Sequence, residues 1–231
     1  MTNIKILENF EIEINKIDDA IGKPSTDDSL FWLNQGVAKF TKLRFNGDPT
    51  HDTSYEQTEK RRADLINLFT SKKYSKADIR KVDKQPSYDE YIIKYPEDFM
   101  FVLNEDVVIC DNKGEHAMDT CVFECTRDSF MYRITNSLTD FHYRYHRARP
   151  LRIRDAQGCE LLTDKNYKIQ EYTLGYLRKP KEITLDNPFE EYTDFEDIIM
   201  PEIIKIAAQM YLENKKDERY KTIAAEVSTQ E

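Results

Sequence analysis

The sequence predicts an α+β fold, with N-terminal helices and a C-terminal helix packed together and an antiparallel β-sandwich or barrel-like domain between them. Apolar residues recur every three or four positions near both ends of the chain, whereas they alternate every second position in its middle. Segregated helix and strand patterns indicate the α+β class. We expect an N-terminal helical part (residues 1–82), a β-domain (residues 83–181) and a C-terminal helix (residues 182–231) that returns to the helical part.

The composition is that of a globular protein, and it narrows the possible functions. The chain has 231 residues, 39% of them hydrophobic and 12% aromatic, which is enough for a substantial core. Its net charge of −9 argues against a protein that coats DNA, because such proteins usually carry the opposite sign. The sequence has neither a signal-peptide pattern nor an apolar stretch that could span a bilayer. We therefore expect a soluble protein, made in a cytoplasm, with no membrane contact.

Two amphipathic helices are predicted near the N-terminus. The first has an apolar stripe and stops at residues 22–24: Leu7, Phe10, Ile14, Ile17 and Ile21. The second is capped by Asp27, Asp28 or Ser29 and ends at Asn46 and Gly47. Its inner stripe is expected to consist of Leu30, Leu33, Val37, Phe40 and Leu43.

A third helix is predicted to follow a capping box at Ser54 and Gln57. Its apolar face is expected to consist of Ala63, Leu65, Ile66 and Phe69. The basic run at residues 71–76 is interpreted as the solvated end of this helix, in preference to a ligand site.

Short strands are predicted from about Asp83 onward. Their alternating patterns lie at residues 91–95, 99–103, 107–110, 120–125 and 130–134. A hairpin turn is expected at residues 111–114. A last strand covers residues 172–177 and ends before Pro180.

The C-terminal helix is predicted to start near Ile199 or Met200, because Pro201 suits the first turn of a helix. The acidic residues 194–197 precede it, at the positive end of its dipole. Its packing stripe is expected to consist of Ile203, Ile206, Ala207 and Met210.

The sequence favours neither zinc binding nor catalysis. Cys110, His116, Cys121 and Cys125 include suitable zinc ligands, but no C-x-x-C knuckle is present, so buried free cysteines are the preferred interpretation. The sequence contains no phosphate loop, nucleophile elbow, metalloprotease helix or Rossmann fingerprint. We therefore expect no metal, no cofactor and no enzymatic activity.

One strongly basic segment, residues 142–154, is the candidate interaction site. It contains five arginines: Arg144, Arg147, Arg149, Arg152 and Arg154. These could meet DNA phosphates in a channel, because guanidinium groups match phosphate geometry and the neighbouring tyrosines can stack on bases. Carboxylates of this chain, or of a neighbouring copy, are the preferred partners.

Several segments resemble a known family. They are residues 31–40 (FWLNQGVAKF), 57–65 (QTEKRRADL), 174–181 (LGYLRKPK), 202–208 (EIIKIAA), 211–214 (YLEN) and 218–220 (ERY). The chain resembles the head-to-tail connector (neck, ring or adaptor) proteins of podovirus-like tailed phages, and most of all the ring proteins of crAss-like phages. The link at residues 186–191 is shorter than the insertions that this family often carries there.

The resemblance implies a virion structural protein in the head-tail neck. It implies a homo-oligomeric ring, a dodecamer, that binds the portal protein and neighbouring neck or tail ring proteins. It also implies a role in linking capsid to tail and in lining the DNA channel through which the genome is ejected. Two alternatives stay open: a soluble phage enzyme or nucleic-acid-binding protein that uses residues 144–154, and a scaffold or adaptor outside the virion.

Overall fold

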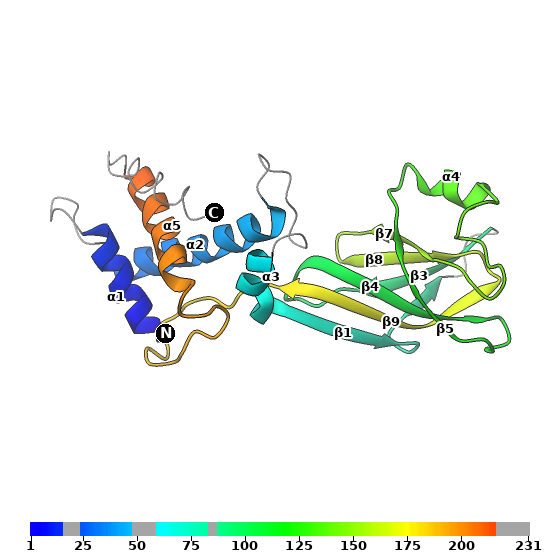
Figure 1. The fold of residues 1–231 in the computed structure, drawn as a ribbon, viewed down its shortest axis with the longest axis horizontal. Helices are drawn as coiled ribbons and strands as arrows, with labels where there is room; N and C mark the ends of the chain where they lie inside the picture. Colours follow the sequence, from blue (N-terminus) through cyan, green and yellow to red (C-terminus); the bar gives the residue numbers. More distant parts are fainter. Residues whose placement is uncertain (16–23, 48–58, 83–86, 216–231) are drawn as a thin grey trace. The chain divides into compact units, whose positions relative to one another are not determined.

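The computed structural model describes residues 1–15, 24–47, 59–82 and 87–215. The chain forms two compact units (Figure 1). We call Met1–Leu68 together with Pro180–Glu231 the helical unit, and Phe69–Lys179 the sheet unit. The predicted α+β class is confirmed, because N-terminal and C-terminal helices flank two sheets in the order of the chain.

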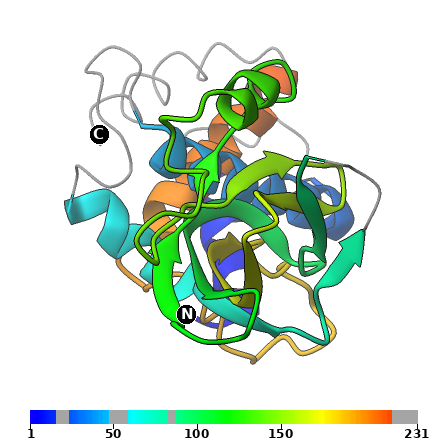
Figure 2. The same ribbon diagram turned by 90° about the vertical axis from the view of Figure 1, so that its right-hand side faces the viewer.

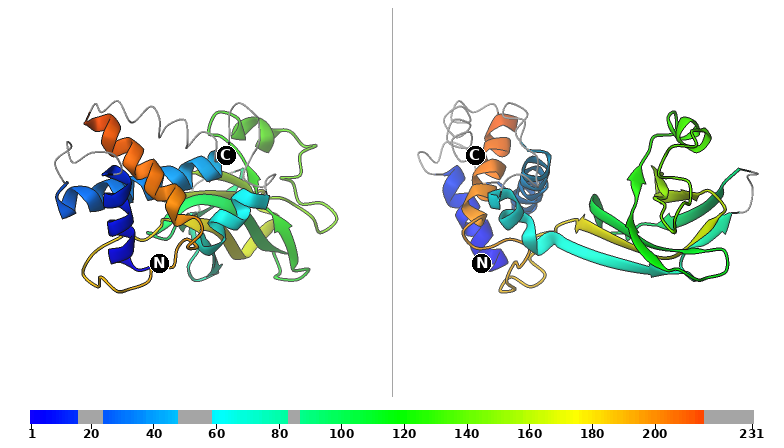
Figure 3. Two further views of the ribbon diagram at one scale, coloured as in Figure 1. Left: turned by 60° about the vertical axis from the view of Figure 1, so that its left-hand side comes forward. Right: turned by 45° about the vertical axis from the view of Figure 1, so that its right-hand side comes forward.

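The helical unit is built on three main helices. Its elements are α1 (Asn3–Ile14), α2 (Thr26–Asn46), α3 (Glu59–Leu65), the short 3₁₀ helix η2 (Ile66–Leu68) and α5 (Met200–Asn214). The C-terminal helix α5 packs against both α1 and α2, as the left view of Figure 3 shows. Helices from the N-terminal and C-terminal parts of the chain therefore pack together, as predicted.

Apolar side chains and one close backbone approach hold this core together. Phe10, Leu33, Phe40 and Ile203 are fully or almost fully buried. Gly36 of α2 faces Ala207 of α5 so closely that a Cβ on the glycine would lie 2.7 Å from the Ala207 Cβ. A side chain at position 36 would therefore push α2 and α5 apart.

The helix ends differ in detail from the prediction. Helix α1 begins at Asn3, and Ile17, Ile21 and residues 22–23 of the predicted stop lie outside the described residues. Ser25, and not residues 27–29, caps α2, because its hydroxyl accepts a hydrogen bond from the Asp28 amide. In the predicted stripe of α2, Leu30 is half-buried and Leu43 is exposed.

Two sheets form a sandwich in the sheet unit (Figure 2). The first sheet has the order β1 (Phe69–Ser75), β9 (Tyr167–Arg178), β4 (Phe99–Asp111) and β5 (Met118–Cys121). The second has the order β2 (Arg80–Val82), β3 (Asp89–Lys94), β8 (Gly158–Thr163), β7 (Leu151–Arg154) and β6 (Phe123–Glu124). All neighbours run antiparallel except β6 and β7.

The basic run at residues 71–76 is not a helix end. The predicted third helix is short and ends at Leu65, and Phe69–Ser75 forms strand β1, paired with β9 along its full length. The predicted capping box at Ser54 and Gln57 lies outside the described residues. Strand β1 is an edge strand, where exposed lysines are typical because they prevent pairing with further strands.

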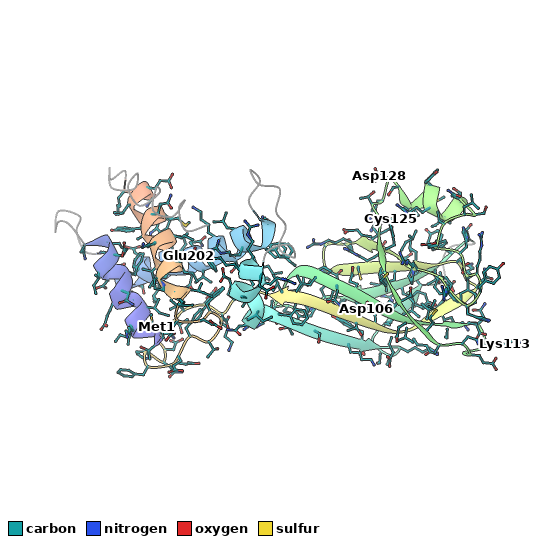
Figure 4. All side chains as sticks on the ribbon, in the orientation of Figure 1. Met1, Asp106, Lys113, Cys125, Asp128 and Glu202 are labelled. Carbon is teal, nitrogen blue, oxygen red and sulfur yellow. The ribbon has the colours of Figure 1, made fainter. Side chains whose placement is uncertain are left out.

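Residues 130–134 are helical and not a strand. Helix α4 (Phe130–Thr135) packs over the second sheet, because Ile134 joins a small apolar cluster with Phe141, Leu151 and Ile153. Met131 and Tyr132 point to solvent. Figure 4 marks Cys125, which belongs to the same cluster.

Three predicted strands are divided differently in the structure. Residues 99–103 and 107–110 form the single long strand β4, with irregular register against β9. Residues 120–125 are divided between β5 and β6, which belong to different sheets. The predicted turn at residues 111–114 is confirmed, since it follows β4 and leads to β5, with Gly114 at a φ of 86°.

Candidate interaction surface

A tight turn presents the first two arginines of the basic segment. The Arg144 amide donates to the Arg147 carbonyl at 2.9 Å, and the Arg147 amide donates back to the Arg144 carbonyl at 2.8 Å. The two residues between them, Tyr145 and His146, have φ values of 50° and 62°. Both positive values are typical of a type I′ turn, which usually contains asparagine and glycine. Two bulky side chains in such a turn cost free energy, which favours a role for Tyr145 and His146 in contacts with other molecules.

Buried contacts fix the base of this turn. The Tyr143 amide donates to the Asp164 carboxylate at 2.7 Å, and the Tyr143 ring stacks on Tyr167 with ring centroids 5.6 Å apart. Ala148 is buried in the core between the sheets. The His146 ring also lies on the His116 ring, with centroids 4.0 Å apart. The turn is therefore held in one position although its tip is in water.

We call residues 144–149 the basic loop. Arg144, Arg147 and Arg149 are exposed in it, and Tyr145 is 94% exposed. The Arg149 guanidinium lies 3.9 Å from the Asp140 carboxylate. Within the part of the chain that the structure describes, neither Arg144 nor Arg147 forms an ion pair.

The three arginines surround a shallow depression. Apolar side chains contribute to its lining: Met118, Leu138 and Ala148. His142 and Asp140 lie at its edge with the arginines. The depression could accept an apolar side chain flanked by anionic groups, because guanidinium groups bind carboxylate and phosphate equally well.

Arg152 does not belong to this surface. It is 5% exposed, and its Nε lies 2.9 Å from a carboxylate oxygen of Glu105, inside the sandwich. Its second partner, Glu124, is mostly exposed. The alternation of β7 explains this position, since Leu151 and Ile153 face α4 and Arg152 faces the opposite side of the sheet.

Glu105 lies in a polar group of buried side chains. The Tyr172 hydroxyl donates to its carboxylate, and the Cys159 thiol lies 3.8 Å from the same hydroxyl. Burial raises the pKa of Glu105 above its usual range, although Tyr172 and Arg152 oppose the rise. Burial also raises the pKa of the Cys159 thiol to about 12, so this thiol is inert at neutral pH.

Arg154 lies apart from the basic loop, at the C-terminal end of β7. It is exposed, and its guanidinium carbon lies 5.6 Å from the centroid of the Phe99 ring. The five arginines of the segment therefore have three different environments, and only those of the basic loop share a surface.

The predicted packing stripe of α5 faces the helical core for most of its length. Ile203, Ile206 and Ala207 are buried, whereas Met210 is half-buried. Tyr211 and Leu212 are buried beyond it. Glu202, marked in Figure 4, forms an ion pair with the buried Arg44 of α2.

The four cysteines and His116 do not converge on one point among the described residues. Cys110, Cys125 and Cys159 are buried as free thiols, and Cys121 is exposed. Ligand atoms of Asp111, Glu115 and His116 do lie within 4.8 Å of one another, on the turn after β4. The Asp111 carboxylate accepts hydrogen bonds from the Lys113 and Glu115 amides, which lower its pKa, so this cluster is explained by the turn itself.

The structure also shows an acidic surface, of which the sequence indicated only residues 194–197, as carboxylates at the start of the C-terminal helix. We call residues 182–197 the acidic segment. Its exposed carboxylates are Glu182, Asp186, Glu190, Glu191, Glu196 and Asp197. A turn at residues 187–190 exposes the Phe189 ring, which is 80% exposed, between Asp186 and Glu190.

Hydrogen bonds to the helices hold this segment in place. The Asn3 and Ile4 amides at the start of α1 donate to the Glu190 and Pro188 carbonyls, at 3.0 and 2.9 Å. The Asn34 side chain of α2 exchanges two hydrogen bonds with the Ile183 backbone. These bonds use backbone atoms of the segment, and the Asp186, Glu190 and Glu191 side chains are exposed.

The basic loop and the acidic segment are exposed, charged surfaces on which contacts with other molecules can form. Comparison with protein families identifies the class of protein. The family model for the phage tail ring protein 3/4, from crAss-like phages, matches residues 1–192, and the chain belongs to this family. A search of curated proteins gave no match. The protein is therefore a structural component of the phage virion, and the predicted resemblance is confirmed.

Within the described residues, no helix is both long enough and apolar enough to cross a membrane.

Proposed function

We propose that this protein is a head-to-tail connector: a homo-oligomeric ring that binds the portal and joins the DNA-filled capsid to the tail. The family match carries the proposal, because residues 1–192 include the whole sheet unit and the first three helices of the helical unit. A ring built from copies of one chain needs ordered surfaces that face other copies. The basic loop and the acidic segment are such surfaces.

The proposed ring is a dodecamer with neighbouring neck or tail rings on either side. Its inner surface forms part of the channel for the genome. The basic loop is the part of the described chain best suited to a contact with DNA, because Tyr145 can stack on a base while Arg144 and Arg147 meet phosphates. This observation supports a DNA contact as the second candidate role of the loop.

Particles assembled without this chain test the proposal. We expect DNA-filled heads and free tails, because the joint between them is missing. Cryo-electron microscopy of complete particles should show the chain as a twelvefold ring next to the portal, and cross-linking should join it to the portal protein. Tailed, infectious particles in the absence of the chain would contradict the proposal.

A further inference from the structure

The two compact units carry very different charges. The sheet unit contains 19 Lys and Arg against 18 Asp and Glu, whereas the helical unit contains 15 against 25. Their net charges are thus +1 and −10. The net negative charge of the chain therefore belongs to the helical unit, and the exposed Arg144, Arg147 and Arg149 belong to the sheet unit.

Each unit presents a tight turn with an aromatic ring at its tip. In the basic loop the ring is Tyr145, between Arg144 and Arg147. In the acidic segment it is Phe189, in a turn closed by the Glu190 amide, which donates to the Asn187 carbonyl at 3.0 Å. Pro188 suits the second position of such a turn. The two turns match in size and are opposite in charge.

Much of the charge of the two turns is not paired with an opposite charge. The Arg144 guanidinium donates to the neutral Ser137 carbonyl, and the Arg149 guanidinium lies 3.9 Å from the Asp140 carboxylate. In the described part of the chain, Asp186 and Glu191 form no ion pair, and neither do Arg144 and Arg147. Three guanidinium groups around one depression repel one another, and the same holds for the neighbouring carboxylates around Phe189. Contact between the two surfaces would relieve both repulsions.

We propose that the basic loop of one copy binds the acidic segment of the next copy. Phe189 enters the depression lined by Met118, Leu138 and Ala148, and the carboxylates of Asp186, Glu190 and Glu191 pair with Arg144, Arg147 and Arg149. An aromatic side chain in a pocket, ringed by arginine contacts, is the usual centre of a strong interface. This inference rests on the proposed ring, and it names the surfaces that join its copies.

A second copy is the partner because both surfaces belong to the same chain. An interface between two different patches of one protein is heterologous, and heterologous interfaces generate closed rings when the rotation between copies closes. A ring that depends on exposed charges should also weaken in salt, since the screening length falls from about 10 Å at 0.1 M to about 3 Å at 1 M.

Charge reversal tests the pairing. One variant carries Arg144→Glu, Arg147→Glu and Arg149→Glu, and the other carries Asp186→Lys, Glu190→Lys and Glu191→Lys. All six side chains are exposed, so both variants should fold, which circular dichroism will check. Ring formation by the full chain is measured by mass photometry, in the presence of its neighbouring neck proteins.

We expect each variant alone to need at least tenfold more protein to form rings. An equal mixture should form rings as the parent does, because each reversed loop then meets a reversed segment in an alternating ring. A chain with all six changes should behave like the mixture. The matched control reverses three exposed carboxylates elsewhere in the helical unit, Glu8→Lys, Asp27→Lys and Glu213→Lys, and should not restore rings when mixed with the loop variant.

Phe189→Ala tests the apolar part of the contact separately. It leaves every charge in place and should still raise the concentration needed for ring formation severalfold, because the aromatic anchor is lost. A Phe189→Ala chain that forms rings as readily as the parent would remove Phe189 from the interface.

Three outcomes would overturn the inference. If both reversed variants form rings like the parent, the two surfaces do not meet, and the proposed ring function stands without them. If the chain with six changes forms rings but the mixture does not, the two surfaces pair within one chain. If the loop variant forms rings but its particles lose DNA, the loop contacts the genome. A parent chain that is absent from the neck of particles would instead contradict the proposed function itself.

Discussion

In the helical unit and in the sheet unit, a buried arginine pairs with two carboxylates, in different surroundings. In the helical unit Arg44 pairs with Asp64 of α3 and Glu202 of α5, whose side chains are 12% and 18% exposed. In the sheet unit Arg152 pairs with Glu105, which is only 7% exposed. The first pair lies at the partly hydrated rim of a core, and the second lies inside one.

The sheet core also contains more buried tyrosine hydroxyls than the helical core does. Among the described residues, buried tyrosines are more numerous in the sheet core, which includes the rings of Tyr74, Tyr91, Tyr167 and Tyr172, than in the helical core, which includes those of Tyr192 and Tyr211. Burial raises the pKa of Asp64, as it does that of Glu105. We therefore expect the sheet unit to be sensitive to changes in charge, and the helical unit to changes in volume.

The largest effect is expected from Arg152→Met. It leaves Glu105 buried without its partner, which typically costs about 3–5 kcal/mol. Chemical unfolding of the full chain at pH 8, followed by circular dichroism, measures the loss. The double variant Glu105→Leu with Arg152→Met is the control, and it should recover most of the lost stability because neither charge remains. If Arg152→Met alone is as stable as the parent, the ion pair of Arg152 and Glu105 is not buried between the sheets.

The cost of Arg152→Met should fall as the pH is lowered. The pKa of Glu105 is already raised by burial in the parent, and removing Arg152 raises it further. A carboxyl whose folded pKa lies above its unfolded value stabilises the fold fully below the unfolded pKa, and this stability is lost as the pH rises through the folded pKa. When unfolding is measured at a series of pH values from 8 to 5, the difference in unfolding free energy between the variant and the parent should therefore become smaller as the pH falls.

Gly36→Leu tests the sensitivity of the helical unit to volume. A Cβ at this position already meets Ala207, so a leucine must separate α2 from α5, at a cost of about 3 kcal/mol. Thermal unfolding measures the effect. The neighbouring Gln35 is exposed, and Gln35→Leu should change stability by no more than about 0.5 kcal/mol. Equal effects at the two positions would show that α2 and α5 are not in close contact.

The loss of stability in Arg44→Met can be compared directly with that in Arg152→Met. Arg44→Met removes the ion pairs with Asp64 and Glu202, whose side chains are 12% and 18% exposed and are therefore less completely buried than Glu105, so we expect a cost of about 2 kcal/mol. Unfolding of the two methionine variants under identical conditions gives the difference. A larger loss of stability for Arg44→Met than for Arg152→Met would contradict the expectation that the more deeply buried ion pair costs more to break.

The helical unit follows closely from the sequence because its signals are local. The spacing of Phe10 and Ile14, or of Leu33 and Val37, indicates both a helix and its buried face. Pro201 indicates where α5 begins. The predicted cap of α2 lies a few residues after the observed one, because Asp27, Asp28 and Ser29 are as suitable chemically as Ser25.

The sheet unit follows less closely because its signals depend on distant partners. Strand β1 has one buried side chain, Tyr74, and is a strand because β9 lies beside it. Helix α4 forms because Ile134 packs on Phe141 and Leu151. Nothing near Arg152 in the sequence indicates that Glu105 and the facing sheet surround it.

The candidate surfaces show the same limit. The sequence identifies the basic segment by composition, but three-dimensional packing separates the exposed Arg144, Arg147 and Arg149 from Arg152. The acidic segment looks like an ordinary loop in the sequence. Its fixed position depends on α1 amides that are far away along the chain.

The smallest effect on stability is expected for Arg144→Gln, Arg147→Gln and Arg149→Gln together. Unlike Arg152, these side chains are exposed, so the triple variant should unfold within about 0.5 kcal/mol of the parent. Each single change should be nearly silent in assembly as well, because exposed ion pairs contribute little individually.

The triple variant separates the roles of the basic loop. Weaker ring assembly with normal DNA retention indicates contacts with protein, and normal assembly with genome loss indicates contacts with DNA. Size measurements of the ring and the DNA content of particles distinguish them. A triple variant that matches the parent in both would show that the basic loop is only a solvated surface.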